Sequence, residues 1–152
     1  GLGDVYKRQV FMQVTDDYGV MVINNRLRSS DIRKKVFVIE QKCPPEIEYE
    51  FEETSTHFLL IQDGDAICTS RYRETDKGIK LERFAVLKEY RKQGAGHKIL
   101  KFMLDDLKKF NGLIYMHAQI DVVPFYEKMG FIKEGEVFEE AFIMHYKMKL
   151  RR

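Results

Sequence analysis

The residues best suited to chemistry begin with a short loop rich in small side chains. It spans residues 91–96, Arg-Lys-Gln-Gly-Ala-Gly, after a strand-like stretch and directly before a long amphipathic one. The first N–H groups of a helix have no intrahelical partner, and the helix dipole places partial positive charge there. Glycines let an anion approach the backbone closely. The loop therefore predicts an anion site, and the alternative is a glycine turn that only allows the helix to start.

Two common phosphate-binding motifs are absent from the sequence. There is no G-x-x-x-x-G-K-[ST] segment, which excludes a P-loop NTPase. There is also no G-x-G-x-x-G followed by an acidic residue about 20 positions later, which argues against a dinucleotide-binding fold. The loop must therefore be interpreted together with the elements that position it.

The spacing of apolar residues predicts those elements. We expect strands over residues 20–23, 58–62, 66–73, 79–87, 113–119, 131–132 and 142–150, and helices over 31–40, 94–110 and 122–129. This order is an antiparallel meander followed by strand–helix–strand–helix–strand. It predicts an α/β (α+β) fold with a mixed, mostly antiparallel central sheet of six to seven strands and helices on both faces. On the strand over 79–87, positions 80, 82, 84 and 86 are expected to share one face.

Composition limits the class of protein. Apolar residues make up 44% and charged residues 33% of the 152 residues, and the net charge is only +2, which is low for a binder of duplex nucleic acid. No apolar run approaches the roughly 20 residues that cross a bilayer. Cys43 and Cys68 form no CxxC motif, and no two of the four histidines are spaced by three or four, so we expect no metal site and a cytoplasmic protein with reduced thiols. Residues 1–9 resemble translated adapter sequence from DNA library preparation, which leaves one domain over residues 10–152.

Two segments together resemble the GNAT superfamily of acyl-CoA-dependent N-acyltransferases, over about residues 32–150. The family pattern Q/R-x-x-G-x-G/A follows a hydrophobic-Ala-Val strand end, here residues 84–86 and then 91–96. The second signature is Phe-Tyr-Glu-x-x-Gly-Phe, here residues 125–131. The segments 36–41, 44–46, 117–119 and 135–140 resemble a bacterial GNAT subgroup of largely unassigned substrate.

The resemblance implies acetyl-CoA as acyl donor, no metal, and a pair of strands splayed apart at the cofactor site. The residues that it implies in cofactor binding are Phe84, Ala85, Val86, Arg91, Lys92, Gln93, Gly94, Ala95, Gly96, His97, Gln119 and Tyr126. Pantetheine would bind along residues 84–86 as an added strand does. Many members have Asn where this chain has Gln119, which leaves a direct contact there open.

Acyl transfer to an amine needs a base for the amine and an acid for the leaving thiolate. The resemblance assigns the base to Glu82, with an ion pair to Arg71, Arg73 or Arg83 as the alternative. It assigns the acid to Tyr126, because a phenol of pKa near 10 can protonate a thiolate whose conjugate acid has a pKa near 8.5. The alternative for Tyr126 is a core residue with one hydrogen bond.

Weaker candidates surround the acceptor. Glu40, Glu48 and Tyr49 could bind a cationic amine, although a solvated acidic loop over residues 46–53 is the simpler interpretation. His117 and His145 could serve as alternative bases or as hydrogen-bonded structural residues. We expect transfer of an acetyl group from acetyl-CoA to a primary amine of a small molecule in a ternary complex, by a monomer or homodimer. A non-catalytic acyl-CoA sensor and a protein-lysine acetyltransferase are the alternatives.

Overall fold

The computed structural model describes residues 12–14, 21–23, 32–34, 51, 54–62 and 64–152. In this part of the chain, one eight-stranded sheet has the order β1-β2-β3-β4-β5-β6-β8-β7. The strands are β1 Met12–Val14, β2 Met21–Ile23, β3 Thr56–Gln62, β4 Asp65–Glu74, β5 Ile79–Val86, β6 Ile114–Gln119, β7 Phe131–Glu140 and β8 Ile143–Leu150. All neighbours pair antiparallel except β5 and β6. The mixed, mostly antiparallel sheet is confirmed, and the three-residue β1 adds one strand to those expected.

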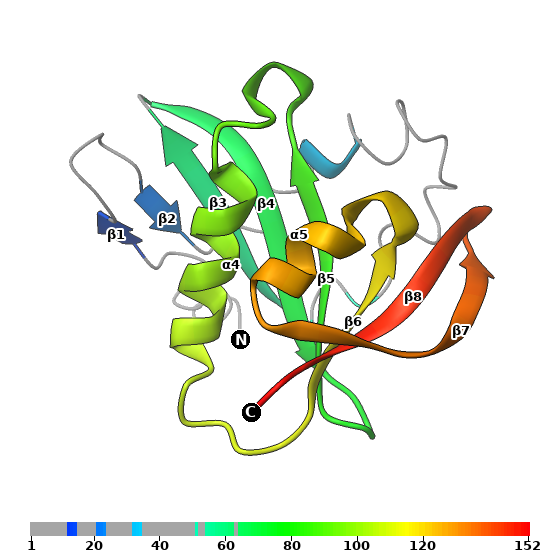
Figure 1. Cartoon of the computed structure of the whole chain (residues 1–152). Helices are drawn as coiled ribbons and strands as arrows, with labels where there is room; N and C mark the ends of the chain where they lie inside the picture. The colour runs from blue at the N-terminus through cyan, green and yellow to red at the C-terminus, as the bar shows by residue number, and fades with distance from the viewer. Residues whose placement is uncertain (1–11, 15–20, 24–31, 35–50, 52–53, 63) are drawn as a thin grey trace.

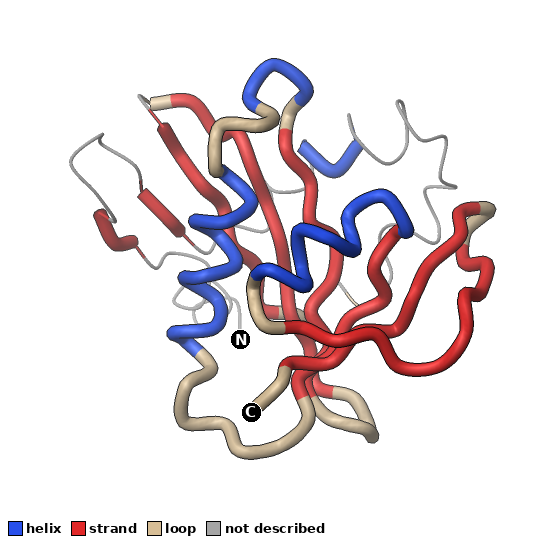
Figure 2. The backbone as a smooth tube through the Cα atoms, viewed as in Figure 1, coloured by secondary structure: helices blue, strands red, loops and turns tan. Residues whose placement is uncertain are grey.

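Helices cover both faces of the sheet (Figures 1 and 2). The main core lies between one face and the helices α4 (Ala95–Asp106) and α5 (Val123–Lys128). Ile99, Leu100 and Met103 of α4 are fully buried there, at the three- and four-residue spacing of an amphipathic helix. A smaller cluster on the other face joins Ile32, in a helical segment over residues 32–34, to Leu59, Ile61 and Ala85. Most of the expected helix over residues 31–40 lies outside the described residues.

Strand β5 contains a bulge that changes which side chains share a face. Glu82 pairs with Arg71 and Ala85 with Thr69, so Arg83 and Phe84 together face a single residue of β4. Arg83 has φ +58, the left-handed conformation that such a bulge needs. One extra residue reverses the alternation beyond it. The expectation that positions 80, 82, 84 and 86 share one face is therefore wrong: Phe84 and Val86 pack against the main core, whereas Ala85 lies in the smaller cluster, on the face of Glu82.

The two parallel strands separate along their length. β5 and β6 pair through only three positions, Ile79 with Ile114, Lys80 with Tyr115 and Leu81 with Met116. Beyond Leu81 and Met116 both strands continue, to Val86 and Gln119, without pairing to each other. The splayed pair that the sequence predicts is confirmed, and it leaves main-chain edges on both sides of the opening.

Some element bounds differ from expectation. Helix α4 ends at Asp106, four residues before the predicted end, because Leu107 leaves helical geometry and Phe110 N–H bonds back to the carbonyl of Leu107. Strand β7 continues to Glu140 instead of stopping at residue 132. Its exposed, glutamate-rich part hides the strand pattern, but it pairs with β8 around a bulge between Glu134 and Phe138. A 3-10 turn, η2 Lys88–Tyr90, precedes the glycine loop, and a second, η3 Ile120–Val122, precedes α5.

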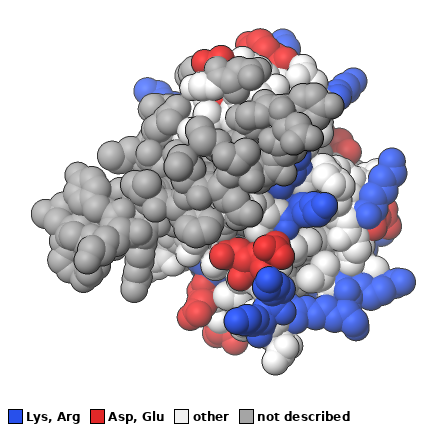
Figure 3. Space-filling model, turned by 90° about the vertical axis from the view of Figure 1, so that its left-hand side faces the viewer, with Lys and Arg blue, Asp and Glu red and all other residues white. Residues whose placement is uncertain are grey.

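Several predictions fall on residues outside the described ranges. They concern residues 1–9, Cys43, and the acceptor candidates Glu40, Glu48 and Tyr49. Among the described residues, no helix is long and apolar enough to span a membrane. On the described part of the face in Figure 3, basic side chains gather at the lower right, beside a smaller group of acidic ones.

Candidate active site

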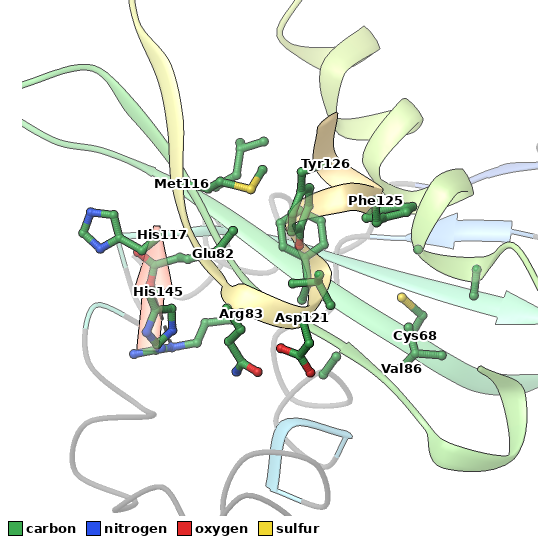
Figure 4. A pocket seen from close by; sticks show the side chains of 18 of the residues that line it. Cys68, Glu82, Arg83, Val86, Met116, His117, Asp121, Phe125, Tyr126 and His145 are labelled. Carbon is green, nitrogen blue, oxygen red and sulfur yellow. Dashed lines mark ion pairs between the residues drawn. The ribbon is translucent and has the colours of Figure 1, made fainter. Parts of the chain in front are cut away.

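A cleft of about 840 Å³ opens where β5 and β6 separate. Its walls come from the second half of β5, the glycine loop, the first turn of α4, the end of β6, η3, α5 and the β7–β8 hairpin. This volume lies within the usual range of pockets that bind small molecules and cofactors. Figure 4 shows Tyr126 and Phe125 on one side of the cleft, His117 and His145 on the other, and Glu82 between them.

The glycine loop forms one end of the cleft. Gly94 has φ +88 and is the N-cap residue of α4, and a Cβ placed on it would meet nothing within 4 Å. Its carbonyl accepts the N–H of Lys98, so the N–H groups before Lys98 have no partner inside the helix. A Cβ on Gly96 would lie 3.5 Å from the ring of Phe125. The loop thus presents open backbone at a positive helix end, which is the geometry of an anion site.

The Arg91 side chain braces this loop. Its Nε donates to the carbonyl of Val86, 3.0 Å away, and ties the end of β5 to the turn before α4. Arg91 and Lys92 both line the cleft, and Lys92 has φ +63. Gln93 differs from the other loop residues, because its exposed side chain donates to the carbonyl of Glu89 and does not line the cleft.

Most of the residues singled out from the sequence come together here. Those that line the cleft are Glu82, Phe84, Ala85, Val86, Arg91, Lys92, Gly94, Ala95, Gly96, His97, Gln119 and Tyr126. Gln93 is the exception. Cys68, Lys80 and Phe125 also line the cleft, and no pattern in the sequence singles them out. Cys68 is a core residue whose pKa is raised by burial, and only its position on β4 opposite Val86 brings it here.

Tyr126 is buried among aromatic rings at the centre of the cleft wall. Its ring makes edge contacts with Phe84 at 5.7 Å, Phe125 at 5.1 Å and Phe131 at 6.1 Å between centroids. Burial, with a smaller contribution from Cys68, raises the pKa of Tyr126 above its ordinary value, so the phenol keeps its proton at neutral pH. Its hydroxyl makes no hydrogen bond to any described residue, unlike a core tyrosine with one partner. Tyr126 therefore keeps its hydroxyl proton and lines the cleft as a candidate proton donor.

Glu82 is the centre of a buried ion-pair network. Its Oε2 accepts from Arg71 at 2.6 and 3.1 Å, and its Oε1 accepts from Nε of Arg73 at 2.7 Å. Lys80 and Arg83 add cations at 3.9 and 3.8 Å. Burial alone would raise the pKa of Glu82, but these cations outweigh it and hold the pKa below the ordinary value. The alternative considered for this residue, an ion pair with arginine, is present in the structure.

Two histidines face the same part of the cleft. His117 Nδ1 lies 3.2 Å from Oε2 of Glu140, and this contact is the largest cause that lowers the pKa of Glu140 to about 2. His145 Nδ1 lies 2.7 Å from the carbonyl oxygen of Ile143. The ring of Phe138 contacts both histidines, with its centroid 5.0 Å from that of His117 and 5.9 Å from that of His145. Both histidines therefore have one ring nitrogen fixed by a partner. Among the described residues, no group of three or more His, Cys, Asp or Glu side chains is arranged to hold a metal ion.

Comparison with known proteins agrees with this geometry. Residues 15–152 match the family described as the acetyltransferase (GNAT) domain. The chain belongs to the GNAT family. GNAT proteins are acyl-CoA N-acyltransferases, and the family uses acetyl-CoA as the acyl donor.

Individual relatives extend the match. This GNAT chain is 35% identical over 121 residues to the uncharacterized N-acetyltransferase YjcF of Bacillus subtilis. The alignment covers 77% of this chain and 86% of the relative. An acyl-CoA N-acyltransferase structure from Pseudomonas aeruginosa matches with a TM-score of 0.72 at 25% identity, over 81% of this chain and 87% of the other. A GNAT acetyltransferase from Elizabethkingia anophelis, solved with acetyl-CoA bound, shares the fold with a TM-score of 0.57 at 18% identity, over 70% and 80% of the two chains.

Proposed function

We propose that the protein transfers an acetyl group from acetyl-CoA to a primary amine of a small molecule, in a ternary complex. The observation that carries this proposal is the separation of β5 and β6 after Leu81 and Met116, with the N-terminus of α4 at one end of the resulting cleft. An acyl-CoA needs both features, since it has a charged diphosphate and an amide-bearing arm of different chemistry.

The residues present fit the acyl donor. The diphosphate would lie on the N–H groups of Ala95, Gly96 and His97, where the absent side chain of Gly94 leaves open space and Arg91 and Lys92 supply positive charge. The pantetheine arm would hydrogen-bond along residues 84–86 on the side of β5 that no longer pairs with β6, as an added β-strand does. The backbone N–H of Val86 or a neighbour would polarise the thioester carbonyl.

The two faces of the sheet would then bind different substrates, the acyl donor on one and the amine on the other. The bulge at Arg83 puts Phe84 and Val86 on the side of α4 and α5, and Glu82 on the other side. The thioester would reach from the donor side into the gap between the strands, and the amine would approach from the side of Glu82, His117 and His145. Such an arrangement lets both substrates bind at once, which direct transfer requires.

Proton transfer completes the reaction. An alkyl ammonium must lose a proton before its nitrogen can attack, because its pKa is near 10.4. The C–N bond then forms and the C–S bond breaks, and Tyr126 would give its phenolic proton to the departing sulfur. Glu82 is the base that the family resemblance implies, but both of its oxygens already accept hydrogen bonds from arginines. Its role would instead be to hold Arg71 and Arg73 in place beside the cleft.

A screen for thiol release tests the proposal. The protein is incubated with acetyl-CoA and a panel of polyamines, amino sugars, amino acids and aminoglycosides, and free thiol is measured with and without each amine. We expect amine-dependent release for at least one class. Tight acetyl-CoA binding with no amine-dependent release over the whole panel would favour the non-catalytic sensor instead.

A further inference from the structure

Resting on the proposed function, we propose that His145 is the base that takes the proton from the acceptor amine. His145 is on β8, is only 8% exposed, and lines the cleft. It lies on the acceptor side with Glu82 and His117, away from the glycine loop (Figure 4).

The contact with Ile143 decides which nitrogen of His145 can accept a proton. A carbonyl oxygen only accepts hydrogen bonds, so at 2.7 Å Nδ1 must be the donor and carry hydrogen. In the neutral ring the lone pair then lies on Nε2. The ring of Phe138, stacked at 5.9 Å and 24°, holds the imidazole in this orientation. Because no described residue hydrogen-bonds to Nε2, this nitrogen is available to a substrate.

The register of the strands places His145 at the reacting end of the gap. His145 pairs with Gln119, the last residue of β6. If the β5–β6 register is continued past Leu81 and Met116, allowing for the bulge, Gln119 faces Ala85 in the segment that would bind the acyl arm. His117, paired with Lys147, lies two residues nearer to the closed end, opposite Glu82. His145 is therefore the histidine beside the expected thioester.

The competing bases are less suitable. Glu82 has both oxygens occupied by Arg71 and Arg73. His117 has an open Nε2, but its place in the register is deeper in the gap. The charged and titratable groups that share the cleft with His145 include Arg73, Lys80, Glu82, Arg83, His117, Asp121 and Glu140. Of these, Glu140 is electrostatically coupled to both histidines.

The ammonium gives one proton to Nε2 of His145, and the neutral nitrogen attacks the thioester carbonyl. As the C–N bond forms and the C–S bond breaks, the sulfur takes the proton of Tyr126. The second proton lost by nitrogen restores the phenol through solvent, and the imidazolium passes its proton to water. The products are an N-acetyl amine, the free thiol of CoA and one proton.

A pair of matched variants tests the assignment. His145→Asn puts an amide N–H where Nδ1–H was, so the bond to Ile143 can persist while Nε2 is lost. His117→Asn makes the same change beside Glu140. With the amine that gives the highest kcat/KM in the screen, we expect His145→Asn to lower kcat by about 100-fold, in the usual range for proton-transfer groups. KM for acetyl-CoA should stay within about twofold, and the acidic limb of the wild-type pH profile of kcat/KM should disappear.

The controls separate the two proposals. His117→Asn should keep the acidic limb of the pH profile whatever its effect on the rate, and calorimetric Kd values for CoA should be unchanged in both variants. Nitrogen NMR shifts of the free wild-type protein should show His145 with hydrogen on Nδ1 and none on Nε2. The opposite tautomer, or a His145→Asn enzyme with full rate and an unchanged pH profile, would overturn the assignment while leaving the acetyltransfer proposal intact. A wild-type protein that acetylates no amine of the panel would remove both.

Discussion

At the scale of single residues, Tyr126 has surroundings that fit one chemical role. It is buried, its pKa is raised by that burial, and its hydroxyl is not committed to any described residue. We therefore expect Tyr126→Phe to lower kcat by roughly ten- to a thousandfold, because the thiolate would leave without a proton. KM for both substrates should change little, since the ring and its aromatic contacts remain. Steady-state thiol release measures this, and a full-rate variant would remove Tyr126 from the acid role.

Glu82 is expected to act on stability as well as on activity. Replacing it with Gln leaves Arg71, whose side chain is fully buried, without a counter-charge, and breaking a buried pair in this way costs about 3 kcal/mol. Because the folded-state pKa of Glu82 lies below its ordinary value, its contribution is present above about pH 4.5 and is lost as pH falls further. Urea unfolding at a series of pH values should show the gap between wild type and Glu82→Gln narrowing in acid. A gap that is independent of pH would contradict the ion-pair account.

At the scale of elements, the glycine loop makes a prediction that has an internal control. Gly94 and Gly64 both have left-handed φ, +88 and +84, and a Cβ would meet nothing within 4 Å at either. Alanine should therefore strain each turn similarly, by about 1 kcal/mol. Of the two, only Gly94 lines the cleft, where the new methyl group would occupy the place proposed for the diphosphate. Calorimetry should show that Gly94→Ala lowers the affinity for CoA by about tenfold, which corresponds to about 1.4 kcal/mol of binding free energy.

Gly64→Ala, in the turn between β3 and β4, should destabilise the fold similarly and leave the affinity for CoA unchanged. Equal losses of affinity in both variants would mean that general destabilisation, not the loop, explains the effect.

The elements also show how far sequence reasoning can reach. The hairpin turn at Gly64, the strand before the glycine loop and the amphipathic face of α4 follow from local spacing, and the structure has them. The bulge could not be predicted, because Arg83 gives no local signal for a left-handed residue. The bulge places Glu82 and Phe84 on opposite faces of the sheet. The prediction that they share a face is wrong because the bulge arises from pairing with β4, which is distant in the sequence. The extent of β7 was hidden for a related reason, since its pairing with β8 does not require an apolar pattern.

At the scale of the whole molecule, one opening passes between two neighbouring strands, β5 and β6, of a continuous sheet. The donor is expected on the side of α4 and α5, and the acceptor on the side of the charged network and the two histidines. Membership of the GNAT family is established by the match over residues 15–152. Membership of the family does not determine the acceptor amine. The side chains expected to face the amine are Glu82, His117 and His145.

The most direct test of this account is product analysis with isotope-labelled acetyl-CoA. The protein is mixed with the labelled donor and the best amine of the screen, and mass spectrometry follows the label and the free thiol together. The account predicts one labelled N-acetyl amine for each thiol released, with both signals reduced together in Tyr126→Phe. Thiol release that proceeds at the same rate without amine, with the label recovered as acetate, would contradict transfer to an amine at this cleft.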